Sequence, residues 1–107
     1  MKIAHVRQFA LALPEAAELP HHHYASFRVA GKIFVTVPPE GTHIHVFVGE
    51  EVREPALAMY PSFVEKLEWG NKIVGLRIAL AEAHPEVVVT LVSQAWQTKA
   101  PKRLLSA

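Results

Sequence analysis

The chain contains neither cysteine nor aspartate among its 107 residues. The absence of cysteine excludes disulfide scaffolds, zinc–thiolate sites and thiol catalysis. The longest stretch without a charged residue, residues 87–98, has 12 residues, well short of the roughly 20 that cross a bilayer. Lys2, His5 and Arg7 interrupt the apolar positions at the start, so no signal-peptide core is expected there. We therefore expect a cytoplasmic protein without a membrane partner.

The composition is that of a globular chain, with 50% hydrophobic and 20% charged residues. At this length we expect one domain with one core, spanning residues 1–107. The formal net charge is only +1, but it is distributed unevenly: residues 50–69 are acidic and the chain from residue 70 onward is basic. We expect any anion-binding surface to lie in that basic part.

Three helices are predicted from apolar spacing and from proline. Apolar residues at helical intervals predict a helix over residues 2–13. A short acidic helix is predicted to start at Glu54, because carboxylates favour the first turn of a helix. The last helix is predicted between Pro85 and Pro101, and its apolar stripe is expected to bury Trp96.

Two-residue alternation of apolar side chains predicts five strands, at residues 24–29, 33–37, 42–48, 62–68 and 72–80. Residues 14–22 have no usable period and are interpreted as a surface loop. Trp69 precedes a glycine at the expected tip of the second hairpin, and whether it is exposed or packed stays open. The expected fold is α+β, with an antiparallel sheet of about five strands, helices on one face and the order α-β-β-β-α-β-β-α.

Six short strings follow one another along the chain: Ala10-Leu11-Ala12-Leu13-Pro14, Ser26-Phe27-Arg28-Val29, Gly31-Lys32-Ile33-Phe34, Trp69-Gly70, Ala95-Trp96 and Ala100-Pro101-Lys102-Arg103-Leu104. In this order and spacing they resemble the MmcQ/YjbR family of small bacterial cytosolic proteins. The resemblance spans nearly the whole chain and implies a double-wing, DNA-binding type of domain. DNA is the partner that it implies, on the strength of likeness of fold.

Cations beside turns and rings on a strand face are the candidate contacts to nucleic acid. The expected phosphate contacts are Lys32, Lys72, Lys99, Lys102 and Arg103, supported by Arg28 and Arg77, and the rings expected to stack on bases are Tyr24 and Phe47. Together they predict weak, salt-dependent binding through hairpin wings and a basic C-terminal tail.

The outward face of the expected sheet supports a second interpretation. Alternation places on it Tyr24, Ser26, Arg28, Thr36, His43, His45, Phe47 and Arg77. A sheet with helices on only one side exposes its other face, which a second copy commonly covers. The alternative function is therefore a self-associating or protein-partner module, with a homodimer as its assembly and no role for nucleic acid.

Catalysis and metal binding find little support in the residues present. His43 and His45 lie two residues apart on one strand, within reach of a single metal ion, and His21, His22 and His23 follow one another nearby in the sequence. A catalytic zinc needs three ligands and a supporting shell, which the pattern does not contain, so no metal and no cofactor are expected, although binding by these histidines stays open. No serine stands in a nucleophile elbow and no glycine-rich loop precedes a helix, so we expect no enzyme activity.

Overall fold

The computed structural model describes residues 1–105 and folds them into four helices and six strands. In chain order these are α1 (Ile3–Ala12), β1 (Ala16–His21), β2 (Tyr24–Val29), β3 (Lys32–Val37), β4 (His43–Val46), α2 (Glu50–Met59), β5 (Val64–Trp69), β6 (Lys72–Ala79), α3 (Pro85–Lys99) and α4 (Lys102–Leu105). Within these residues, no helix combines the length and the apolar character needed to cross a membrane.

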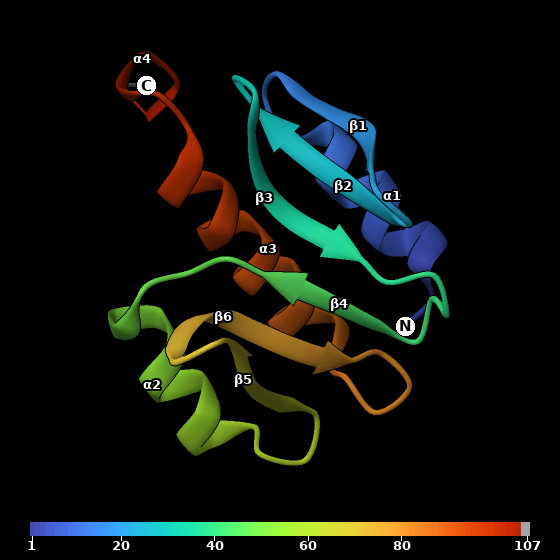
Figure 1. The fold of residues 1–107 in the computed structure, drawn as a ribbon, viewed down its shortest axis with the longest axis vertical. Coiled ribbons are helices and arrows are strands. Elements are labelled where there is room, and N and C mark those ends of the chain that lie inside the picture. The colour runs from blue at the N-terminus through green and yellow to red at the C-terminus, as the bar shows by residue number, and fades with distance from the viewer. Residues whose placement is uncertain (106–107) are drawn as a thin grey trace.

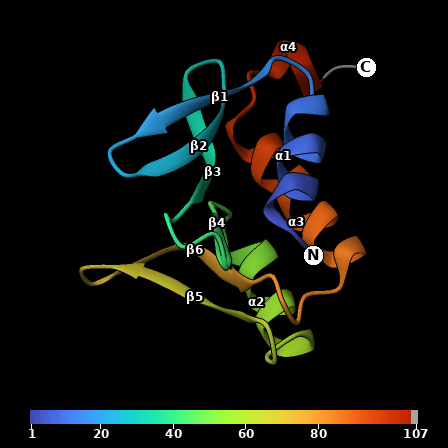
Figure 2. The same cartoon turned by 90° about the vertical axis from the view of Figure 1, so that its right-hand side faces the viewer.

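The strands form one antiparallel sheet in the order β1-β2-β3-β4-β6-β5 (Figure 1). Figure 2 shows α1, α2 and α3 on one side of this sheet, while two hairpins extend from the other side. The predicted α+β class, with helices on one face of an antiparallel sheet, is therefore confirmed. The sheet has six strands in the described chain, one more than predicted.

The additional strand is β1, which lies in the segment interpreted from the sequence as a loop. It pairs with β2 from Ala16 opposite Val29 to His21 opposite Tyr24. Because β1 is an edge strand with one unpaired side, it tolerates Pro20, which has no N–H to donate to a ladder. Its side chains are half-buried at best, so the apolar alternation that reveals the inner strands is missing.

The core lies between the sheet and the helices. Phe27, Ile44 and Leu76 are fully buried on the sheet. The apolar stripe of α3 packs on them with the buried residues Val88, Leu91, Val92, Ala95 and Trp96. The indole N–H of Trp96 donates to the carbonyl oxygen of Pro14 at 3.0 Å, so the one polar atom of this ring is satisfied. The predicted core position of Trp96 is confirmed.

Helix α2 begins at Glu50 rather than at Glu54, so Pro55 lies inside the helix instead of in its first turn. Glu50 and Glu51 occupy the first turn, where carboxylates face the positive end of the helix dipole. Since proline has no N–H, the carbonyl of Glu51 receives no helical hydrogen bond from residue 55. The predicted start was placed too late because proline is most common in the first turn.

We expect Pro55→Ala to raise the free energy of unfolding by about 1 kcal/mol, because alanine restores a helical hydrogen bond and removes the crowding of the ring. The gain is smaller than the full propensity difference, since proline also restricts the unfolded chain. Urea unfolding followed by circular dichroism measures it. A loss of stability would show that packing of the ring outweighs both effects.

Gly75 marks a close approach between β6 and the chain that leaves β4. A Cβ placed at Gly75 would lie 2.1 Å from the carbonyl oxygen of Val46 and 3.2 Å from the Cα of Phe47. The first distance is shorter than any non-bonded contact of a Cβ allows, the second is tight, and both neighbours are backbone atoms. The path of the chain from β4 toward α2 therefore requires glycine at this position.

Candidate functional site

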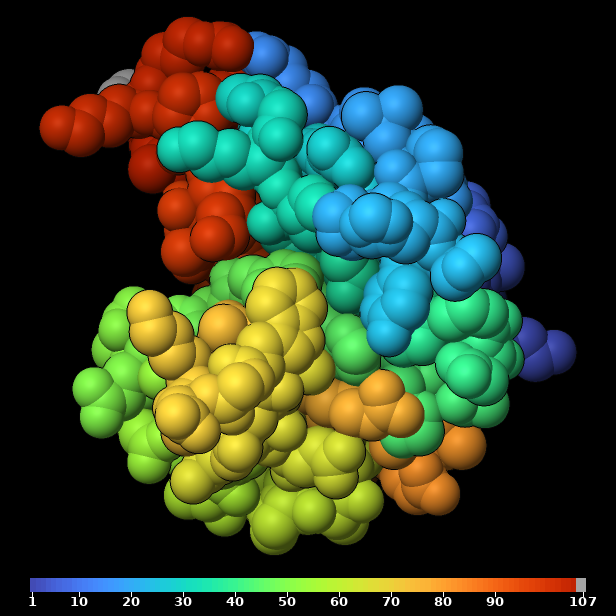
Figure 3. All heavy atoms as spheres, viewed as in Figure 1, coloured from blue at the N-terminus to red at the C-terminus, as the bar shows by residue number. Residues whose placement is uncertain are grey.

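Two hairpins extend from the sheet on the side opposite the helices (Figure 2). One is β1–β2, with its turn at His22 and His23, and the other is β5–β6, with its turn at Gly70 and Asn71. Gly70 has a φ of 62°, which its place at the first position of a two-residue turn requires. Figure 3 shows the first hairpin in light blue and the second in yellow, with strand atoms in green between them.

A row of side chains crosses all six strands on the face between these hairpins. The strand register aligns Leu19, Ser26, Thr36, His45, Arg77 and Glu65 from β1 to β5, and we call these residues the cross-strand row. Ser26, Thr36 and His45 are buried although they are polar. Buried polar groups of this kind need hydrogen-bond partners.

At the β1 end of the row, the partners come from β1 and β2. The hydroxyl of Ser26 donates to the carbonyl oxygen of Leu19 at 2.6 Å. Nε of Arg28 donates to the Ser26 oxygen at 3.1 Å, and Nη2 of Arg28 lies 3.4 Å from the carbonyl oxygen of Pro20. Arg28 is thus held against the β1–β2 hairpin.

At the centre of the row, His45 contacts residues on both sides. Nη1 of Arg77 lies 2.9 Å from Nε2 of His45, and the Thr36 oxygen lies 3.4 Å from Nδ1 of the same ring. Nε of Arg77 is also paired with Glu65 at 3.4 Å. Burial, and then the positive charges of Arg77 and His43, lower the pKa of His45 to about 4. His45 is therefore neutral at physiological pH.

Above this part of the row lies a cavity of about 210 Å³, which we call the inter-hairpin cavity. It is lined by His21, His22, Tyr24, Thr36, His45 and Trp69. Thr36 and His45 come from the inner strands, whereas the other four belong to the two hairpins. Trp69 is 55% exposed and Tyr24 37% exposed, so a ligand entering the cavity would meet an aromatic ring from each hairpin.

Phe47, expected from the sequence to stack on a base, is buried instead of exposed. Its ring packs edge-on against Trp69, with 5.4 Å between the ring centroids. The exposed ring at this position is therefore Trp69, which settles the question left open by the sequence. Phe47 has the role of a support beneath it.

The candidate cations do not form one surface. Arg77 lies on the cross-strand row, Arg28 lies beside it and bonds to Ser26, and Lys72 lies beside the β5–β6 turn. The other four are at the end of the molecule uppermost in Figures 1 and 2: Lys32 beside the β2–β3 turn, and Lys99, Lys102 and Arg103 in the last turn of α3 and in α4. Arg103 donates to Glu15, with 2.7 Å between Nη2 and Oε1. Hairpins and tail therefore present their charges at separate places.

The candidate metal ligands do not form a coordination site, although His21, His22 and His45 all line the inter-hairpin cavity. Nδ1 of His43 lies 2.9 Å from the hydroxyl oxygen of Thr42, and both ring nitrogens of His45 already have protein partners. The rings of His21 and His22 lie beside each other, with centroids 4.7 Å apart and their planes tilted by 60°. In the described part of the chain, no group of three or more metal-ligating side chains is arranged to hold an ion.

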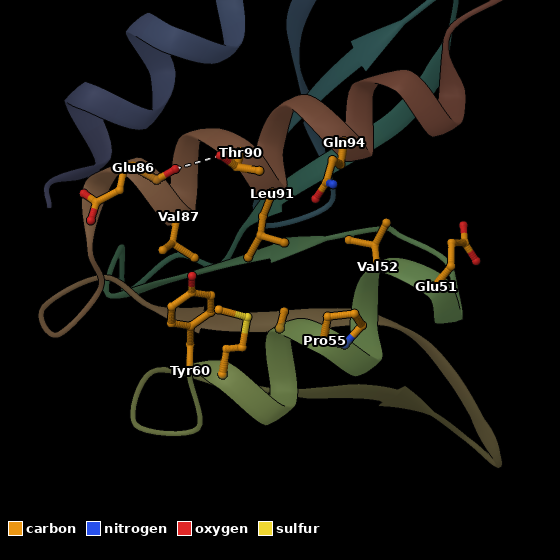
Figure 4. A pocket seen from close by; sticks show the side chains of 11 residues that line it. Glu51, Val52, Pro55, Tyr60, Glu86, Val87, Thr90, Leu91 and Gln94 are labelled. Carbon is orange, nitrogen blue, oxygen red and sulfur yellow. Dashed lines mark hydrogen bonds between the residues drawn. The ribbon is translucent and has the colours of Figure 1, made fainter.

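A second hollow, of about 300 Å³, lies between α2 and α3 (Figure 4). Its inner wall is apolar, with Val87 and Leu91 of α3 facing Val52 and Pro55 of α2. The hydroxyl of Thr90 donates to the carbonyl oxygen of Glu86, so it is used within its own helix. The rim of this hollow carries the polar side chains Glu51, Glu86 and Gln94, but the exposed aromatic rings of two hairpins face one another only across the inter-hairpin cavity, and we take that cavity as the candidate site.

Comparisons with known proteins agree on the family and on the fold. A family model described as YjbR matches residues 11–98. Among solved structures, the chain is similar to the Deinococcus radiodurans protein DR2400, described with the domain DUF419, with a TM-score of 0.76 and 16% identity over 91% of this chain and 77% of that chain. At this identity the similarity shows the fold alone. No curated protein sequence matches the chain.

Proposed function

The chain belongs to the YjbR family, and from this premise and the inter-hairpin cavity we propose that it is a non-enzymatic domain that binds single-stranded nucleic acid, with one unpaired base in the cavity. The observation that carries the proposal is the pair of exposed rings, Tyr24 and Trp69, presented by two hairpins on either side of a polar floor. Aromatic side chains of this kind are the usual platforms for unstacked bases.

The size of the cavity favours one base over a duplex. A volume of about 210 Å³ is below the roughly 300–1,000 Å³ of pockets that hold drug-sized ligands, which limits the occupant to a single flat ring. A base within a duplex is stacked on both faces and paired at one edge, and it cannot enter such a cavity without being extruded. A single strand presents the base without that cost.

The charges near the cavity support weak binding to the backbone of the strand. Arg77 lies on the row, Arg28 bonds to Ser26 of the row, and Lys72 lies beside a hairpin turn; Arg77 is already paired with the exposed carboxylate of Glu65. With two or three phosphate contacts, the logarithm of the affinity should fall with the logarithm of salt concentration at a slope of about −2. The net charge of +1 is consistent with a small electrostatic contribution.

We expect Trp69→Ala to weaken binding to a short fluorescein-labelled oligodeoxythymidine at least about fivefold, because one aromatic stack contributes about 1–3 kcal/mol. Fluorescence anisotropy at several salt concentrations measures the affinity and its slope. Met59→Ala serves as a matched control, since Met59 is 66% exposed but lies at the α2–α3 hollow, and it should leave the affinity within about twofold.

A double variant distinguishes the contribution of the two hairpins to affinity from that of the C-terminal tail. Lys32→Gln combined with Arg103→Gln removes two charges from the far end of the molecule and should change affinity less than Trp69→Ala does.

The alternative assignment, a module that associates with itself through this face, predicts a different result. Association in sedimentation experiments that is lost in Trp69→Ala, without binding to any oligonucleotide, would contradict the proposal.

A further inference from the structure

The hydrogen position on His45 follows from its neighbours. The guanidinium of Arg77 can only donate, so Nε2 of His45, 2.9 Å from Nη1, must accept. A neutral ring that accepts at Nε2 carries its hydrogen on Nδ1. The tautomer of His45 is therefore set by Arg77, which does not itself line the cavity.

The tautomer determines what Thr36 can do. Nδ1–H of His45 points toward the Thr36 hydroxyl oxygen at 3.4 Å, so that oxygen accepts. The hydroxyl hydrogen of Thr36 is then left to donate elsewhere, and among residues 1–105 no acceptor for it is found. Thr36 is only 3% exposed and lines the inter-hairpin cavity. The floor of the cavity thus presents a hydrogen-bond donor.

The other polar groups that line the cavity do not add an acceptor of fixed role to the donor of Thr36. The indole of Trp69 carries only a donor, while His21, His22 and the hydroxyl of Tyr24 can each donate or accept. The two groups whose hydrogen-bonding role is fixed, the Thr36 hydroxyl and the Trp69 indole, are therefore both donors to a ligand. A ligand edge that carries an amino group would leave the Thr36 hydroxyl unpaired, whereas a carbonyl oxygen would satisfy it.

We infer that the inter-hairpin cavity selects a base with a carbonyl oxygen at its buried edge, thymine or uracil, over the amino base cytosine. The inference rests on the proposed function and names the ligand of that same site. Thymine and cytosine are both pyrimidines, and at position 4 one carries oxygen and the other an amino group, while thymine also has a C5 methyl group and a hydrogen on N3. Variants of Thr36 are therefore needed to separate the hydrogen bond from the contribution of the methyl group, because they change the hydroxyl and leave the two bases as they are.

The test is the affinity of the full chain for short oligodeoxythymidine and oligodeoxycytidine at neutral pH, measured by fluorescence anisotropy. One hydrogen bond of about 1 kcal/mol corresponds to a preference of about fivefold for thymidine. Thr36→Val removes the donor and keeps the shape, so it should lower thymidine binding to the level of cytidine. Thr36→Ser restores a hydroxyl and should restore the preference. Circular dichroism confirms that each variant is folded.

The possible results distinguish a failure of the base preference from a failure of single-strand binding. Equal binding of the two strands by the wild-type chain, or a preference that persists in Thr36→Val, would overturn the inference while leaving single-strand binding in place. Absence of binding to either strand would overturn the proposed function, and the inference with it. A thymidine preference that disappears in Thr36→Val and returns in Thr36→Ser supports both.

Discussion

Gly75→Ala should destabilise the fold by at least about 3 kcal/mol, a large fraction of the stability of a domain this size. The added Cβ would stand 2.1 Å from the carbonyl oxygen of Val46, which is backbone and cannot rotate away. Relief requires β4 and β6 to separate where both are buried, and overpacking of that kind is costly. Urea unfolding followed by circular dichroism measures the change, with wild type in parallel.

Gly49→Ala is the matched control for this substitution. A Cβ at Gly49 would meet only the carboxylate end of the Glu51 side chain, which is flexible and can move. We therefore expect a loss of no more than about 1 kcal/mol, the usual effect of replacing glycine by alanine at a helix N-cap. If Gly75→Ala were as mild as Gly49→Ala, the approach of β4 to β6 would have to be looser than described.

The stability of the protein should fall by about 3 kcal/mol as the pH decreases from 6.5 to 4, through His45 alone. The pKa of His45 is about 4 in the folded chain, against an ordinary value of 6.5. Between these values the unfolded chain binds a proton that the folded chain does not, so acid favours unfolding. Above pH 6.5 both states are neutral at this residue and the effect vanishes. Unfolding midpoints in urea across this range measure it.

His45→Gln is the variant that isolates this contribution. The side-chain oxygen of glutamine can accept from Arg77 as Nε2 does, but it does not titrate. The pH dependence of the variant between 6.5 and 4 should therefore be flatter than that of wild type, even though the other histidines remain. Identical slopes for the two proteins would mean that His45 is protonated in the folded chain as readily as in the unfolded one.

Much of the fold could be predicted because the inner elements follow simple periods. The hydrophobic stripe that includes Trp96 and the alternation around Ile44 and Leu76 each report burial on one side. β1 was not predicted because an edge strand that is barely buried lacks the alternation of apolar and polar side chains, and because Pro20 suggests a turn. The start of α2 was misplaced for a similar reason, since Pro55 is an exception to the usual position of proline in helices.

The site was harder to predict than the fold. Tyr24, Thr36, His45 and Arg77 could be assigned to one strand face from alternation alone, and the register confirms that the last three are neighbours. That Trp69 would cover Phe47 depends on how the hairpins project from the sheet, which no local pattern specifies. The separation of the tail cations from the hairpins likewise follows from topology. Residues of like charge in different parts of the sequence share a surface only if the fold brings them together.

The strand order has a consequence for how copies of this chain can meet. The sheet ends in β1 on one side and β5 on the other, and open strand edges invite pairing between molecules. β1 carries Pro20, and β5 carries Glu65, Lys66 and Glu68 as exposed side chains. Proline and charge are the common means by which proteins prevent sheets from fusing edge to edge. Continuous ribbons of this protein are thus disfavoured at both margins.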